Sequence, residues 1–193
     1  MTKSREEKLR KVAQQRQAEF IVVLEDIHDP HNAAAILRTC DAFGVQDVWF
    51  VFVIEKRYNP RRVGKSSSSS ANKWLSFRVF TSNEECGKEL RKLKYESIGT
   101  VLADDTEDMF KMKLTAKKIA LWVGNEHRGL SPAAIAQCDR RLLIPMRGMV
   151  QSMNVSVTTA ICIYEITRQR QEHGRYLLPK SNINYILKDW AKK

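Results

Sequence analysis

Short continuous apolar runs recur along the chain and constrain its fold more than any other feature. Four of them are Phe20–Leu24, 45–54, 118–123 and 141–144. Such runs, without polar alternation, are typical of strands that are buried on both faces. Segments rich in helix formers lie between them, so strands and helices alternate. This pattern predicts an α/β fold with a mainly parallel sheet and helices on both faces.

The expected helices have recognisable starts or stops. Residues 33–43 contain no helix breaker and are followed by Gly44, which favours a helix end. Residues 83–93 are amphipathic, and residues 155–167 are apolar on nearly all sides, which is typical of a buried or interface helix. Ser131-Pro132 resembles an N-cap followed by proline at the first helical position.

The charge balance of the chain points to a polyanionic partner. The sequence has 193 residues with 33 basic and 22 acidic side chains, a formal net charge of +11. This length is most simply one domain, residues 1–193, with a basic N-terminal arm over about 1–18 and a basic C-terminal tail over about 168–193. The excess of positive charge favours nucleic acid over membrane, although a merely basic protein would have the same composition.

Cysteine usage and the terminal segment favour a cytoplasmic location. Four widely spaced cysteines form no C-x-x-C pair, so neither a zinc site nor a disulfide framework is indicated. The first sixteen residues have no apolar core of a signal peptide. The longest apolar run, residues 48–54, is far too short to cross a bilayer.

A basic segment at 56–65 precedes five consecutive serines and then Trp74. This segment is either a flexible surface loop or a groove for an RNA backbone with Trp74 as an anchor.

Three polar loops follow three of the predicted strands, at residues 25–32, 124–130 and 145–154. In open α/β sheets, ligands bind outside the carboxyl ends of the strands. The polar candidates there are Asn32, Arg38, Glu126, Ser152 and Asn154.

These loops also carry three motifs of a known family. His31-Asn-Ala-Ala-Ala-Ile-Leu-Arg-Thr39, Val123-Gly-Asn-Glu-His-Arg-Gly-Leu130 and Ile144-Pro-Met146 through Ser152-Met-Asn-Val-Ser156 resemble motifs one, two and three of the SpoU-type RNA 2′-O-ribose methyltransferases, in the SPOUT superfamily. Their order and spacing agree over roughly residues 20–170. The chain length, the N-terminal arm and residues 148–152 further resemble the tRNA guanosine-2′-O-methyltransferase branch, which modifies the D-loop guanosine at nucleotide 18.

The resemblance implies a fold, a cofactor and an assembly. It implies a deep C-terminal trefoil knot that involves residues from about 120 onward, and an obligate homodimer. It also implies that S-adenosylmethionine binds in the knot, becomes S-adenosylhomocysteine, and works without a metal. The chain contains no G-x-G-x-x-G, so a Rossmann-type methyltransferase is unsupported. By position, the cofactor should meet mostly main chain at four residues: Thr100, Gly124, Ile144 and Met153.

The same resemblance assigns the chemistry on the substrate ribose to Arg38, Asn32, Glu126, Ser152 and Asn154. Arg38 either accepts the 2′-hydroxyl proton with the help of a substrate phosphate, or binds the phosphate and stabilises the developing alkoxide. The second role needs no deprotonated guanidinium. We further expect basic side chains to contact RNA: Arg10, Lys11, Arg61, Arg62, Lys65, Arg168, Arg170 and Arg175.

The expected function is therefore a homodimeric tRNA ribose 2′-O-methyltransferase. The same chemistry on ribosomal RNA or at another tRNA position is the alternative. An RNA-binding module without catalysis is a third reading, against which the intact motif residues argue.

Overall fold

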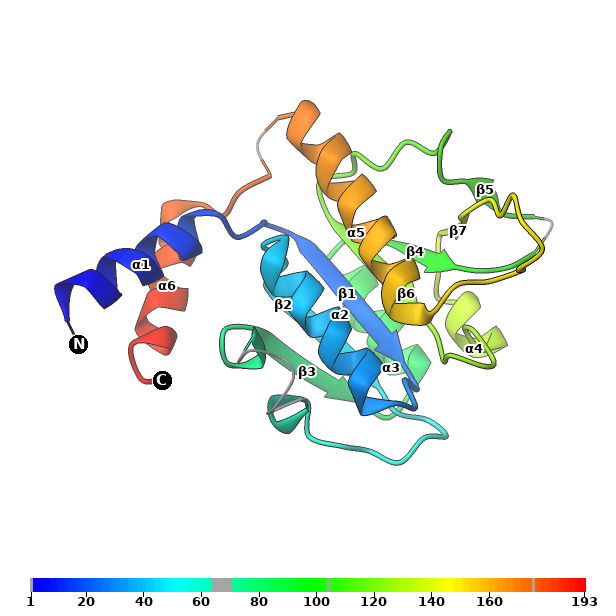
Figure 1. The fold of residues 1–193 in the computed structure, drawn as a ribbon, viewed down its shortest axis with the longest axis horizontal. Helices are drawn as coiled ribbons and strands as arrows, with labels where there is room; N and C mark the ends of the chain where they lie inside the picture. The colour runs from blue at the N-terminus through cyan, green and yellow to red at the C-terminus, as the bar shows by residue number, and fades with distance from the viewer. Residues whose placement is uncertain (1, 64–70, 104, 175) are drawn as a thin grey trace.

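Seven parallel strands form one sheet at the centre of the computed structural model, which describes residues 2–63, 71–103, 105–174 and 176–193. The strand order is β3-β2-β1-β6-β4-β7-β5 (Figure 1). The strands are β1 Phe20–Glu25, β2 Asp47–Val51, β3 Ser76–Phe80, β4 Glu96–Thr100, β5 Glu107–Asp108, β6 Ile119–Val123 and β7 Arg140–Leu143.

Within these residues, six α-helices and two short 3-10 helices connect and flank the strands. The helices are α1 Lys3–Gln14, α2 Pro30–Ala42, α3 Asn83–Lys92, α4 Pro132–Ile135, α5 Val155–Glu172, α6 Lys180–Trp190, η1 Pro60–Arg62 and η2 Ala71–Lys73. The α/β fold with a parallel sheet is confirmed.

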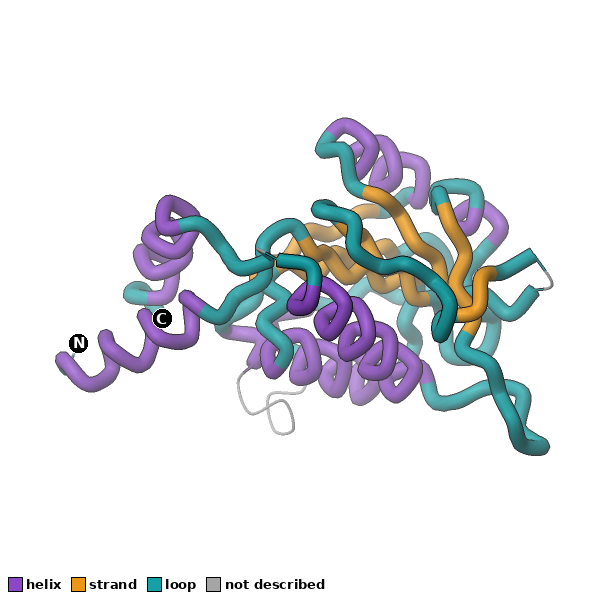
Figure 2. The backbone as a smooth tube through the Cα atoms, turned by 90° about the horizontal axis from the view of Figure 1, so that it is seen from above, coloured by secondary structure: helices purple, strands orange, loops and turns teal. Residues whose placement is uncertain are grey.

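Helices cover both faces of the sheet, as Figure 2 shows. Alternate residues of β1 contribute to two different cores: Val22 packs with residues of α2 and α5, and Val23 packs with residues of α3 and α4. All six residues of β1 are buried. The continuous apolar run of this strand is therefore explained by its central place between two layers of helices. The trefoil knot stays a prediction.

Helix α2 begins earlier than expected from the sequence. Asp29 caps it by accepting a hydrogen bond from the backbone N–H of His31 at 2.8 Å, and Pro30 occupies the first turn. Asn32 consequently lies in the first turn of α2 rather than in a loop. At the other end, Gly44 has a φ of +75° and lies so close to Gln15 that a Cβ atom would approach the Gln15 carbonyl oxygen to 2.4 Å. Glycine is therefore required where the helix ends.

The sequence patterns missed two strands and one α-helix of the described residues. Strand β3, the two-residue strand β5 inside the acidic segment, and helix α6 in the basic tail were not predicted. One of the two alternatives for the basic segment made Trp74 an RNA anchor, and the packing of Trp74 argues against that alternative. Its ring is partly buried and packs edge-on against Trp190, with ring centroids 5.4 Å apart. The serine run lies outside the described residues.

The N-terminal and C-terminal helices form a small unit of their own beside the sheet (Figure 1). Leu9 and Ala13 of α1 are buried against Ile186 and Trp190 of α6. The indole N–H of Trp190 donates to the Trp74 carbonyl at 3.1 Å. The expected basic arm and tail are therefore largely paired helices.

Buried Arg16 joins this unit to the central domain. Its guanidinium pairs with Asp41 near the end of α2, donates to the Val45 carbonyl at 3.5 Å, and lies 5.2 Å from the Trp190 ring centroid. Arg16 is 1% exposed. Because its charge is paired and stacked, it links the two parts rather than facing RNA.

We predict that Trp190→Ala lowers the free energy of unfolding by about 3 kcal/mol, because it removes a large buried side chain and leaves a cavity. Urea unfolding followed by circular dichroism measures this change. Tyr185→Ala on the same helix is the control, since Tyr185 is 77% exposed, and it should change stability by less than about 0.5 kcal/mol. Equal effects of the two substitutions would contradict the packing role of Trp190.

Candidate active site

The motif-bearing segments meet at one edge of the sheet, where β1, β6, β4 and β7 end. These strands are neighbours in the order β1-β6-β4-β7, and all run in the same direction. The segments that follow β1, β6 and β7 therefore emerge side by side. This is the place where parallel α/β sheets bind ligands.

A cavity of about 360 Å³ lies among these segments. All four residues expected to hold the cofactor line it: Thr100, Gly124, Ile144 and Met153. Ser152 lines the same cavity. The size is within the range of pockets that hold small ligands, and apolar side chains such as Leu142 and Met146 form part of the wall.

Gly124 begins a closed turn that shapes this cavity. The main chain of Asn125 and Gly129 exchanges two hydrogen bonds, at 3.0 and 2.9 Å. The turn folds back so closely that a Cβ atom on Gly124 would lie 2.2 Å from the carbonyl carbon of Gly129. Any side chain at position 124 would therefore open the turn.

Asn125 was not predicted as a site residue, yet it holds this turn. Its amide donates to the Asp26 carbonyl at 2.8 Å, and its side-chain oxygen accepts from the backbone N–H of His127 at 2.9 Å. Asn125 is 4% exposed. A buried asparagine inside a polar motif is the signal that could have identified it.

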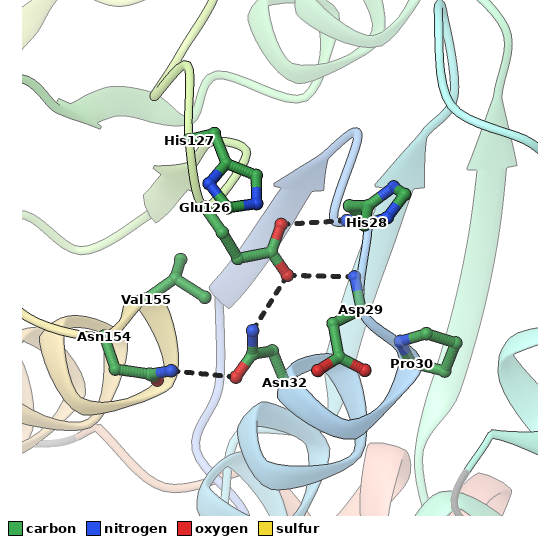
Figure 3. A pocket seen from close by; sticks show the side chains of 8 residues that line it. All are labelled: His28, Asp29, Pro30, Asn32, Glu126, His127, Asn154 and Val155. Carbon is green, nitrogen blue, oxygen red and sulfur yellow. Dashed lines mark hydrogen bonds between the residues drawn. The ribbon is translucent and has the colours of Figure 1, made fainter.

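The carboxylate of Glu126 connects the turn after β6 to the segment after β1 (Figure 3). It accepts hydrogen bonds from the backbone N–H groups of His28, at 2.9 Å, and Asp29, at 3.1 Å. It also accepts from the Asn32 amide at 2.9 Å. Partial burial raises the pKa of Glu126, but these hydrogen bonds outweigh it and hold the pKa below its ordinary value.

Asn32 extends this network to the third segment. Its side-chain oxygen accepts a hydrogen bond from the Asn154 amide at 3.1 Å (Figure 3). The side-chain oxygen of Asn154 caps α5 by accepting from the backbone N–H of Ser156 at 2.8 Å. One chain of hydrogen bonds therefore joins Glu126, Asn32 and Asn154, which belong to three different motifs. These three residues line a second cavity of about 540 Å³.

Arg38 lies apart from this network. It is exposed on α2 and lines a separate hollow with Ala34 of the same helix and Ala160 of α5. The structure thus brings Asn32, Glu126 and Asn154 into direct contact, and places Arg38 on a neighbouring surface.

The expected RNA-binding residues differ in their exposure. Arg10 and Lys11 are exposed on α1, and Arg61 and Arg62 are exposed in η1. Lys65 and Arg175 lie outside the described residues. Arg168 is half-exposed and pairs with two glutamates of its own helix, at 2.8 and 2.7 Å.

Arg170 is a correction to the predicted RNA surface. It is 6% exposed, and its guanidinium donates to the side-chain oxygen of Gln17 at 3.0 Å and to the carbonyls of Ala18, at 2.7 Å, and Lys117, at 3.1 Å. Because the guanidinium of Arg170 donates its hydrogen bonds to oxygens of the protein, it stabilises the fold and does not contact RNA. The periodicity of α5 could have indicated this, because Ile163, Ile166 and Thr167 of the same helix face are buried.

Within the described residues, no group of three or more His, Cys, Asp or Glu side chains could hold a metal ion. In the same part of the chain, no helix combines the length and the apolar character needed to cross a membrane.

The lowered pKa of Glu126 generates a pH-dependent prediction. A carboxylate with a pKa lower in the folded state stabilises the fold above its unfolded pKa of about 4.3, and this contribution is lost as the pH falls through the folded pKa. We therefore expect the stability difference between the wild type and Glu126→Gln to be constant above about pH 5 and to shrink below about pH 4. Urea unfolding at a series of pH values measures it, and a difference that does not vary with pH would contradict the network.

Comparisons with known proteins agree with this geometry. Residues 19–164 match the model of the SpoU rRNA Methylase family. A Thermus thermophilus protein named tRNA (guanosine(18)-2′-O)-methyltransferase is 35% identical, over 100% of this chain and 98% of its own length.

Solved structures show the same similarity. The crystal structure of an A. aeolicus TrmH/SpoU tRNA modifying enzyme is 33% identical, with a TM-score of 0.88 over 98% of this chain and 95% of that one. The SpoU methyltransferase AviRb from Streptomyces viridochromogenes, solved in complex with the cofactor AdoMet, is 27% identical, with a TM-score of 0.70 over 86% of this chain and 62% of that one. The chain belongs to the SpoU methylase family.

Proposed function

We propose that this protein transfers a methyl group from S-adenosylmethionine to the ribose 2′-hydroxyl of the D-loop guanosine at nucleotide 18 of tRNA. The observation that carries the proposal is that the residues expected for the cofactor line one cavity, directly beside the hydrogen-bonded motif residues. A relative named for the same reaction matches along the whole chain.

The cavity at the strand ends fits the proposed cofactor. Its wall combines apolar side chains such as Ile144 with the main chain of Gly124, which suits a flat adenine ring and its hydrogen-bonding edge. Main-chain groups fixed in packed segments are ordered before the ligand arrives, so binding loses little entropy there. The bound cofactor supplies a methyl group that its positively charged sulfur already activates, so the proposed reaction needs no metal.

The polar network serves to position the substrate. The Glu126 carboxylate already accepts three hydrogen bonds, so we assign it the task of holding Asn32 and the start of α2. Ser152 lines the first cavity and Asn154 lines the second, and Glu126 lines both, so we place the substrate ribose and its phosphate where the two cavities adjoin. Holding the two reactants in a fixed geometry lowers the barrier of such a transfer, because the entropy cost of bringing them together is met on binding.

Arg38 has the role of binding the substrate phosphate and stabilising the negative charge that develops on the 2′-oxygen. Its side chain is exposed beside a face of α2 and α5 that carries exposed Val157 and Tyr164. We propose that a second copy of the chain covers this face, so that the homodimer completes the site around Arg38. Each chain contributes a single methyltransferase domain with the paired terminal helices, and works on RNA in the cytoplasm.

We predict that Arg38→Ala abolishes methyl transfer while S-adenosylmethionine binding is retained. Transfer of a labelled methyl group to unmodified tRNA measures the activity, and calorimetry measures the affinity for the cofactor. Arg91→Ala is the matched control, because Arg91 is an exposed arginine of α3 on the other face of the sheet. Loss of cofactor binding together with activity would give Arg38 a folding role instead.

Digestion of the labelled RNA to nucleosides and short fragments tests the assigned position. Label in the ribose of guanosine 18 supports the proposal. Label only in ribosomal RNA, or at another tRNA nucleotide, would show that the enzyme catalyses the proposed reaction on a different substrate. Calorimetry without detectable cofactor binding would favour a non-catalytic RNA-binding module.

RNA affinity should fall steeply with salt concentration, because cationic side chains displace counterions from phosphates. We expect Arg61→Ala to weaken binding at every salt concentration and to reduce the slope of log affinity against log salt by about one. Filter binding measures both values. The contrasting variant is Arg170→Ala, which should lower the free energy of unfolding and leave this slope unchanged, because Arg170 is buried.

A further inference from the structure

Residues 53–57 form an exposed segment directly after β2, which we name the wedge loop. It begins with two neighbouring apolar side chains, Val53 and Ile54, which are 51% and 69% exposed. Lys56 and Arg57 follow and are also exposed. Two adjacent exposed β-branched side chains followed by two cations are unusual for a simple surface turn, and they resemble the make-up of segments that enter nucleic-acid stacks.

A buried carboxylate fixes the start of the wedge loop. Asp26 is 4% exposed and has a φ of +48°. Its side chain accepts hydrogen bonds from three consecutive backbone N–H groups, those of Val53 at 2.8 Å, Ile54 at 3.1 Å and Glu55 at 3.1 Å. The main chain that carries both apolar side chains is therefore held in one conformation.

An aromatic anchor fixes the other end. The Tyr58 hydroxyl donates to the Ile27 carbonyl at 3.2 Å, and the Tyr58 ring packs against Phe52 with centroids 4.9 Å apart. In Figure 1 this part of the chain is the cyan segment near the beginning of α2. Because both ends are anchored, the loop is ordered before it meets a partner and loses little entropy on binding.

Glu55 connects the wedge loop to the candidate active site. Its carboxylate contacts the His28 ring nitrogen Nδ1 at 2.7 Å and the Arg128 guanidinium at 2.7 Å. The backbone N–H of the same His28 donates to Glu126. The exposed apolar pair therefore lies one residue away from a side chain that contacts both segments of the site.

We propose that Val53 and Ile54 insert between stacked bases of the RNA substrate, and so open its folded loop and expose the target ribose to the site. This inference rests on the proposed function. In folded tRNA the D-loop packs against the T-loop, so a ribose there must be freed before its 2′-hydroxyl can reach a protein cavity. Apolar side chains that enter a base step offset the cost of unstacking through new contacts with the bases. Enzymes that act on bases move their target nucleotide out of the stack in a comparable way. Lys56 and Arg57 contact the adjacent phosphates.

Two transcripts distinguish this role from general RNA binding. One is a tRNA in which the D-loop and T-loop are paired. The other is the same tRNA with T-loop bases replaced so that the D-loop is free. We expect Ile54→Ser to lower single-turnover methyl transfer about tenfold or more on the paired transcript, and by less than about twofold on the free one. Lys56→Ala should weaken the binding of both transcripts equally, because a phosphate contact does not depend on the pairing of the two loops.

Phe110→Ser is the matched control. Phe110 is 66% exposed, and it follows β5, at the opposite edge of the sheet from the β2–β3 side. This variant should transfer methyl groups to both transcripts as the wild type does. A second measurement uses a fluorescent adenine analogue beside the target nucleotide, whose emission rises on unstacking. Wild-type binding should raise the emission, and Ile54→Ser binding should not.

Equal loss of activity on both transcripts would overturn the wedge role, and so would unchanged activity or an unchanged fluorescence rise in Ile54→Ser. Dissociation of a homodimer by Ile54→Ser, detected by sedimentation, would assign this loop to a protein interface instead. Wild-type protein that methylates neither transcript but still unstacks the reporter base would remove the proposed function and leave the wedge in place.

Discussion

The hydrogen bonds to Glu126 are the interaction on which the arrangement of the site depends. The carboxylate is partly buried, and burial of an ionised group is unfavourable unless donors surround it. Here two backbone N–H groups and one amide do so, and all three come from the segment after β1. The Glu126 charge is therefore stabilised only when the segments after β1 and β6 lie in these relative positions. The cost of desolvating the charge thus disfavours any other arrangement of the two segments. The adjacency of β1 and β6 in the sheet makes these positions possible.

Two further carboxylates, at the end of β1, hold the segments around the same site. Glu25 is the last residue of β1 and Asp26 follows it, and both are almost fully buried. Glu25 accepts from Asn83 at 2.6 Å and from the backbone N–H of Ser131 at 2.8 Å, at the beginnings of α3 and α4. Asp26 holds the loop after β2. The end of one central strand thus fixes the segments around it, so the site stands on a rigid base rather than on independent loops.

Much of this could be predicted from the sequence, and the reasons for the failures are physical. Central strands such as β1 and β6 were predicted correctly because they are buried on both faces and read as unbroken apolar runs. Strand β3 lies at the sheet edge and carries Arg78 in its middle, so its pattern is weak. Strand β5 has two residues and forms only through its pairing with β7, which no local pattern can reveal.

At the candidate site, too, the sequence predicted some features and missed others. Residues in the three motifs were identified from their order along the chain, while their hydrogen bonds required the fold. Asp29-Pro30 carries the same cap signature as Ser131-Pro132, but the helix start at Asp29 was missed because the polar residues around it resemble a loop. Charge alone misplaced Arg170, because a cation at the end of a helix can turn inward when main-chain oxygens are available there. Long-range partners, such as Trp74 for Trp190, lie beyond any local pattern.

The pairing of α1 with α6 has a consequence for how the chain is made. Leu9 and Ala13 are translated long before the side chains that cover them, which belong to residues such as Ile186 and Trp190. During synthesis on the ribosome, the apolar side of α1 therefore stays uncovered until α6 has been made, after all seven strands of the sheet. Contacts between residues so distant in sequence form slowly. The exposed cations of α1 therefore reach their folded positions only after α6 has been made and has packed against α1.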